Sequence, residues 1–214
     1  MTIVRYMAGN WDTLRPQIST HIEIVAVSIV VAGLVGLILG VLAARSQRVT
    51  SVVIPVSSAI LTIPSFALFG VLTLWLGIGN RPVEAGLVLY ALLPIVRNTR
   101  TGILAVDPAI TEAALGMSMN RRQVFLQIEL PLALPLIIAG LRQAAVLIVA
   151  VATVGAAVGS NNLGQPILEG IRGSNREAVL SGMLPVAAIG ILADACLGLL
   201  QKALTHGRYR VTAA

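Results

Sequence analysis

The feature that most constrains the fold is a series of long apolar stretches that contain almost no charge. The 214-residue chain has a mean hydropathy of +0.90, and 11% of its residues are charged, against about a quarter in a soluble domain. Runs of about twenty apolar residues can cross a hydrocarbon core of about 30 Å as helices. Because they are apolar on all sides and do not alternate, they favour helices over a β-barrel. We therefore predict an all-α, polytopic membrane helix bundle that forms one domain over residues 1–214.

Five of these apolar runs are predicted to cross the membrane. Pro55 and Pro64 fall inside the second run and Pro94 inside the third, so bends are expected there. A short additional span could lie between Val146 and Ile171, which leaves six spans as the alternative. The approximate ranges of the five runs are 22–44, 52–76, 83–103, 134–158 and 179–204.

Basic residues are distributed unevenly between the two sides that five spans would create. Five of them fall on the side of the N-terminus and nine on the other side, and the richer side is expected to be cytoplasmic. The N-terminus is therefore predicted outside and the C-terminus inside, in the cytoplasmic (inner) membrane. A net charge of +6 is typical of a membrane protein with arginines beside its spans, so it indicates no nucleic-acid partner. The nine residues are Arg45, Arg48, Arg97, Arg100, Arg121, Arg122, Lys202, Arg208 and Arg210.

A polar segment over about residues 105–133 separates the third and fourth runs and is predicted to face the cytoplasm. Asp107 followed by Pro108 is typical of a helix start, because the carboxylate caps free N–H groups and proline suits the first turn. Gly116 weakens the helix, so two short helices or a broken helix are expected. Ala113 and Ala114 are small enough for close approach of another surface, and Glu112 can form a charged hydrogen bond with a partner.

The spacing in this segment resembles that of the cytoplasmic coupling loop of permease subunits in bacterial ABC importers. The family pattern is Glu-Ala-Ala, three residues, Gly, nine residues, then Ile-x-Leu-Pro. Ser118 stands where the family usually has glycine, and nearby Gly116 is expected to supply some of the flexibility. The resemblance implies ATPase coupling by Glu112, Ala113, Ala114, Gly116, Ser118, Ile128, Leu130 and Pro131.

Further strings resemble the glycine betaine/carnitine/choline branch of this family, which imports osmoprotectants. They lie at 62–65, 89–94, 97–99, 106–108, 130–135 and 139–142. The resemblance implies a MetI-like type I permease that moves quaternary-ammonium solutes by alternating access. It also implies cytoplasmic ABC ATPase subunits, a second permease subunit (the same or related) and an extracytoplasmic substrate-binding protein. The residues that line the pore are not indicated.

The chain itself shows no motif for covalent chemistry. Its single lysine, Lys202, is not part of a Gly-Lys-Ser/Thr phosphate-binding loop, so ATP hydrolysis is expected on a separate subunit. The single cysteine, Cys196, lies in an apolar run and allows neither an internal disulfide nor a cysteine metal site. Catalytic residues, metal ligands and cofactors are therefore not expected. With only eight aromatic residues, a high-affinity cation–π cage is expected on the binding protein instead.

Two charged residues lie inside predicted spans. Arg142 is about 10 Å and Asp194 about 12 Å from the cytoplasmic end of its helix, at 1.5 Å of rise per residue. Because charge in the membrane is costly, we expect the two to form a structural pair or to share a polar network. The alternative is that Arg142 extends to the headgroups alone.

The outer loop over residues 159–171 contains Asn161, Asn162 and Gly164. In the family, a glycine-rich form of this string leads into a short helix near the pore mouth. The resemblance implies a role in the outer gate or in contact with the binding protein. An ordinary outer loop is the alternative.

Three other functions remain open from the sequence. The same machine could carry an amino acid such as methionine. An ion-coupled secondary transporter would need midplane carboxylates and internal repeats, whereas Asp194 is the one carboxylate noted and no clear repeat is seen. A membrane assembly protein would show no uptake. Homodimeric and heterodimeric pores are equally compatible with the sequence.

Overall fold

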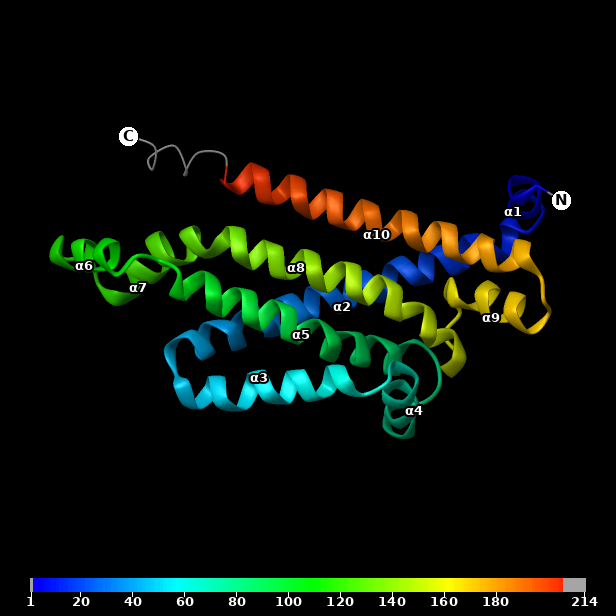
Figure 1. The fold of residues 1–214 in the computed structure, drawn as a ribbon, viewed down its shortest axis with the longest axis horizontal. Helices are drawn as coiled ribbons and strands as arrows, with labels where there is room; N and C mark the ends of the chain where they lie inside the picture. Colours follow the sequence, from blue (N-terminus) through cyan, green and yellow to red (C-terminus); the bar gives the residue numbers. More distant parts are fainter. Residues whose placement is uncertain (1, 206–214) are drawn as a thin grey trace.

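The computed structural model describes residues 2–205, and every regular element in that range is helical (Figure 1). Arg208 and Arg210, which contribute to the predicted charge asymmetry, lie outside the described residues. A π-helical turn (Phe125–Glu129) precedes α8, and a 3-10 turn (Thr153–Val158) follows it. The α-helices are α1 (Ile3–Gly9), α2 (Trp11–Arg45), α3 (Gln47–Thr62), α4 (Ser65–Leu76), α5 (Asn80–Leu104), α6 (Pro108–Gly116), α7 (Arg121–Val124), α8 (Leu130–Ala152), α9 (Gly164–Arg172) and α10 (Arg176–Thr205).

The predicted helix bundle is confirmed, and each predicted span corresponds to a helix or to a pair of helices. By length and apolarity, α2, α8 with its flanking turns, and α10 qualify as membrane spans, and the bent pair α3 and α4 makes a fourth. The extra span considered between Val146 and Ile171 is not found there. That stretch holds the end of α8, the 3-10 turn and most of α9, which has nine residues and is too short to cross a bilayer.

The second predicted span is broken into two helices. The axes of α3 and α4 differ by 105°, so the bend expected at Pro64 is present as a break between two helices. The break lies at Ile63 and Pro64, because a residue before proline is driven out of the helical region and Ile63 is extended, with φ −72° and ψ 129°. The Tyr90 hydroxyl donates a 2.7 Å hydrogen bond to the carbonyl of Ile63. Pro55, by contrast, lies within α3 without interrupting it.

Helix α5, which corresponds to the third predicted span, lies at the centre of the bundle, where it packs against α2 and α8. It is less apolar than α2, α8 and α10, because it carries charged residues near both ends. Small residues allow the close packing. A Cβ added at Gly40 would lie 2.5 Å from Cβ of Thr99, and one at Gly140 would lie 2.9 Å from the carbonyl oxygen of Pro94. Helix contact through small residues is typical of membrane bundles.

Large apolar side chains remain exposed on the outside of the bundle. Leu34 of α2, Trp75 of α4 and Ile191 of α10 are 63%, 74% and 70% exposed. A surface of this kind fits lipid or a partner subunit. The bundle is elongated: α6, α7, the turn between α2 and α3 and the last turns of α10 lie at one end, and α1 and α9 lie at the other (Figure 1).

Candidate functional site: the segment between α5 and α8

The segment between α5 and α8, residues 107–129, forms a projection at one end of the bundle and is called the coupling segment below (Figure 1). Its first helix, α6, begins as the sequence predicts. The Asp107 side chain accepts a 2.9 Å hydrogen bond from the backbone N–H of Ala109, and Pro108 occupies the first turn. The helix ends at Gly116, and a separate short helix, α7, begins at Arg121. The predicted break is therefore present.

Ser118 holds the backbone conformation that ends α6. Its φ is +65°, in the left-handed region that favours glycine. The N–H of Met119 bonds to the carbonyl of Ala114 at 3.2 Å, and the N–H of Ser118 bonds to that of Leu115 at 3.0 Å. These two bonds form a Schellman motif, whose left-handed position is usually glycine. Gly116, from which some of the flexibility is expected, is the last residue of α6 and has no positive φ, so the left-handed conformation lies at Ser118 itself.

The two halves of the recognised pattern occupy different environments. Glu112 and Ala113 are exposed on α6, whereas Ala114 is buried. Ile128, Leu130 and Pro131 are partly buried where the π-helical turn runs into α8. Apolar side chains accompany the exposed half: Met117 is 71% and Leu115 43% exposed. The coupling segment thus offers a carboxylate and apolar groups at its tip.

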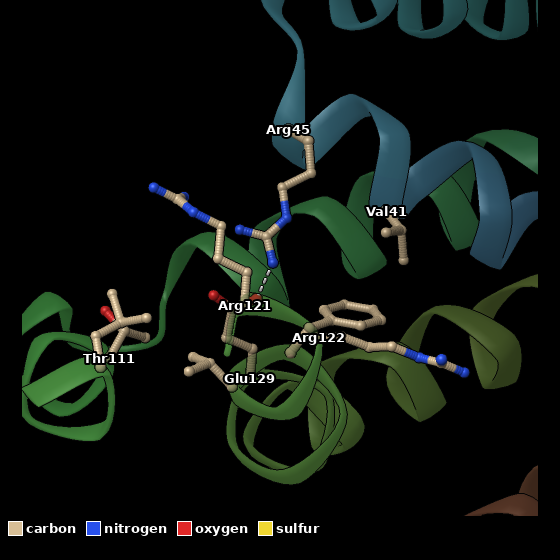
Figure 2. Close-up of a pocket in the computed structure, with 9 residues that line it drawn as sticks. Val41, Arg45, Thr111, Arg121, Arg122 and Glu129 are labelled. Carbon is tan, nitrogen blue, oxygen red and sulfur yellow. Dashed lines mark hydrogen bonds and ion pairs between the residues drawn. The ribbon is translucent and has the colours of Figure 1, made fainter. Parts of the chain in front are cut away.

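Where the coupling segment returns to the bundle, it contacts the end of α2. Arg45, the last residue of α2, forms an ion pair with Glu129, as the dashed line in Figure 2 shows. Its guanidinium also lies over the Phe125 ring, 5.5 Å from the centroid. A pocket of about 480 Å³ opens beside this contact, lined also by Val41 and Thr111. The sequence alone did not identify the contact of Arg45 with Phe125 and Glu129. The one signal for it was that Glu129 occupies the variable position of the Ile-x-Leu-Pro pattern.

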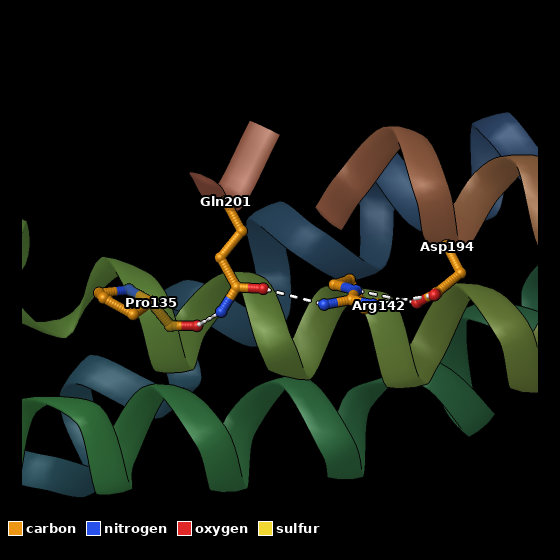
Figure 3. Close-up of polar contacts among 4 residues, drawn as sticks. All are labelled: Pro135, Arg142, Asp194 and Gln201. Carbon is orange, nitrogen blue, oxygen red and sulfur yellow. Dashed lines mark hydrogen bonds and ion pairs between the residues drawn. The ribbon is translucent and has the colours of Figure 1, made fainter. Parts of the chain in front are cut away.

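Arg142 on α8 and Asp194 on α10 lie in direct contact between the two helices, and both are partly exposed (Figure 3). The Arg142 guanidinium donates from Nε and Nη2 to the two carboxylate oxygens of Asp194, each at 2.8 Å. Its Nη1 donates to Oε1 of Gln201 at 3.0 Å, and Nε2 of Gln201 donates to the carbonyl of Pro135 at 2.9 Å. This network joins α8 to α10 and includes Gln201, which sequence reasoning did not identify.

The loop that leads into α9 places its two asparagines in different environments. Asn161 is exposed, whereas Asn162 is fully buried and satisfied by the backbone. Its Nδ2 donates to the carbonyl of Ala152 at 3.0 Å, and its Oδ1 accepts from the N–H of Gly164 at 2.7 Å. A Cβ added at Gly164 would lie 1.8 Å from the carbonyl oxygen of Thr153. Asn162 and Gly164 therefore shape the loop, and Asn161 is the member open to contact.

Several curated proteins are similar to this chain over nearly its whole length. The carnitine transport permease protein OpuCD of Listeria monocytogenes is 38% identical, with 94% of this chain and 91% of that protein covered. The glycine betaine/carnitine/choline transport system permease protein OpuCD of Bacillus subtilis is 38% identical, with 94% and 88% covered. The choline transport system permease protein OpuBD of Bacillus subtilis is 36% identical, with 99% and 94% covered.

Solved structures share the fold at lower identity. A chain of the MetNI methionine ABC transporter in an inward-facing conformation superposes with a TM-score of 0.79 and 20% identity, covering 92% of this chain and 98% of that one. This likeness confirms the predicted MetI-like architecture. The family described as binding-protein-dependent transport system inner membrane component matches residues 36–207. With its spanning helices, this match makes the chain a multi-pass membrane protein, and it belongs to the family of binding-protein-dependent transport system inner membrane components.

Proposed function

We propose that this chain is the permease subunit of an ATP-driven importer for quaternary-ammonium osmoprotectants such as glycine betaine, choline and carnitine. The observation that carries the proposal is the similarity over nearly the whole chain to permeases named for these solutes, at 36% to 38% identity. The methionine transporter is 20% identical, so it supports the fold and not a methionine cargo. A family defined by dependence on a binding protein also argues against an ion-coupled secondary transporter.

In this proposal, the tip of the coupling segment binds a cytoplasmic ATPase. Glu112 on α6 and Met117 directly after it are both exposed there. A carboxylate beside apolar side chains suits a groove that combines basic and apolar groups. Closure of the ATPase pair then moves the coupling segment, and that movement opens and closes a pore lined by the second to fourth spans. The chain forms the path for the solute, and ATP is hydrolysed on the separate ATPase.

The proposed orientation places the coupling segment and the end of α10 in the cytoplasm, with α1 and α9 outside. Loops rich in arginine gather at the end that carries the coupling segment, as expected of the cytoplasmic side. In the same proposal, Asn161 at the outer end faces an extracytoplasmic binding protein, and a second permease subunit covers part of the exposed apolar surface. Arg142 and Asp194 act structurally, because a guanidinium would repel a cationic solute.

The coupling role is tested by charge reversal at the tip. In the complex reconstituted with its ATPase, Glu112→Lys should reduce ATPase association and uptake. The matched control is Glu169→Lys, an exposed glutamate on α9 at the opposite end, which should leave ATPase association unchanged. Unchanged association and uptake in Glu112→Lys would contradict the role of this segment.

The cargo is tested by transport competition. Vesicles that contain the complete transporter should import radiolabelled glycine betaine or choline in an ATP-dependent manner, and unlabelled carnitine should compete. Methionine and other amino acids serve as the control solutes. Competition by methionine alone would assign the transporter to the alternative cargo.

A further inference from the structure

The return path of the coupling segment contains an irregular element whose role the proposed function leaves open. Residues 125–129 form a π-helical turn directly before α8. Such turns are rare and frequently occur at functional sites. Here the turn brings two of its side chains, Phe125 and Glu129, to the end of α2. The element therefore connects α8 and the coupling segment to a third part of the bundle.

The contact on α2 is made by its last residue, Arg45. The Arg45 guanidinium donates to a carboxylate oxygen of Glu129 and lies over the ring of Phe125, at 5.5 Å from the centroid. The Glu129 side chain is 11% exposed, while that of Arg45 is 49% exposed. Separating the pair would leave the charge of the buried Glu129 carboxylate unbalanced. Because this is strongly unfavourable, Arg45 and Glu129 should stay in contact. The Glu129 carboxylate and the Phe125 ring both contact the Arg45 guanidinium, and both belong to the same π-helical turn.

Beside this contact, α6 and α2 face each other across open space. The pocket of about 480 Å³ has Val41 and Arg45 of α2 on one wall and Thr111 and Leu115 of α6 on another (Figure 2). The end of α2 is joined to the coupling segment by the contacts of Arg45 with Glu129 and Phe125, beside an apolar cluster that Val41 and Ala44 share with Phe125.

We propose that Arg45 and Glu129, supported by Phe125, form the joint that passes displacement of the coupling segment to α2. This inference rests on the proposed function, because it takes the coupling segment to be moved by an ATPase. Without the joint, α2 still packs against α5 and α8, but its last turn loses its direct contact with the coupling segment, so less of the displacement reaches it. Arg45 and Glu129 are positioning residues: they touch neither solute nor nucleotide, and they determine how much of the ATPase movement reaches the bundle.

The first test measures uptake and ATP hydrolysis in the same proteoliposomes with the complete transporter. Glu129→Gln and Arg45→Gln should keep ATPase association and hydrolysis, while uptake per ATP hydrolysed falls about fivefold. The exchanged pair Arg45→Glu with Glu129→Arg should restore much of the ratio. The control is Arg48→Gln, an exposed arginine three residues along the chain, which should leave the ratio unchanged. A parallel loss of hydrolysis, uptake and assembled complex would mark a purely structural contact and overturn the inference, as would an unchanged ratio.

The second test does not depend on the cargo. Spin labels at Leu42→Cys on α2 and Met117→Cys on the coupling segment, in a Cys196→Ser background, report the distance between the two parts. Both positions are exposed, and Cys196 is replaced because it is exposed as well. With the joint intact, the distance should stay constant through the nucleotide cycle, and with Glu129→Gln it should change. A distance that varies equally in both proteins would overturn the joint, whereas failure to import osmoprotectants alone would count only against the proposed cargo.

Discussion

Replacing Ser118 by glycine should stabilise the turn that ends α6. Ser118 has a φ of +65°, and a non-glycine residue in the left-handed region costs about 1–2 kcal/mol. Glycine removes that cost but loses about 0.5–1 kcal/mol more conformational freedom on ordering. The net gain is therefore about 0.7 kcal/mol, which corresponds to about a threefold change in the equilibrium for local opening.

Hydrogen exchange in the intact protein measures this opening directly. The reporter is the N–H of Met119, which bonds to the carbonyl of Ala114 only when the turn is formed. Exchange should be slower by about threefold in Ser118→Gly. Ser118→Val should exchange faster, because a β-branched residue is strained more at positive φ. Ser118→Ala is the control for loss of the hydroxyl and should match the wild type. Faster exchange in Ser118→Gly than in Ser118→Val would refute the backbone argument.

Three further predictions concern the bundle, each measured as thermal stability in detergent or nanodiscs. Asp194→Asn and Arg142→Gln should each lower stability, and the double variant should be little worse than either, because they share one bidentate contact; additive losses would indicate independent roles. Gly164→Ala should destabilise by about 3 kcal/mol, since its Cβ would meet the Thr153 carbonyl at 1.8 Å, and wild-type stability would show that the loop has room. Tyr90→Phe should cost about 1 kcal/mol by removing the hydrogen bond at the bend between α3 and α4, and no change would show the bend to be held elsewhere.

The coupling segment illustrates how far sequence reasoning reached. The capping by Asp107, the break after Gly116 and the helical start at Pro108 follow from local rules, and all three are present. The left-handed conformation at Ser118 is not predicted by the sequence pattern. A serine in the left-handed region is uncommon, so local propensity favours the nearby glycine instead. The helix end is set by the pair of hydrogen bonds that close the motif.

The second membrane span is a case in which the sequence predicts bends but not their size. Apolar length locates the second run but does not distinguish a single helix from a pair bent by 105°. Both Pro55 and Pro64 lie in that run, and only Pro64 breaks it. The carbonyl of Ile63, the residue before Pro64, accepts a hydrogen bond from the Tyr90 hydroxyl, 27 positions away in the sequence. Which proline ends a helix thus depends on a partner that the local sequence does not contain.

The sequence alone determined the class of the protein. Long uncharged runs that do not alternate can satisfy their backbone hydrogen bonds in a membrane only as helices, and the coupling pattern has a fixed spacing. It also placed Arg142 and Asp194 at equal depth, since helical rise converts sequence separation into distance. The tertiary structure decided what lies between elements: the Arg45 contact with Phe125 and Glu129, the burial of Asn162 and the extension of the polar network to Gln201. These contacts join residues between 10 and 84 positions apart, so they exist only once the helices have packed.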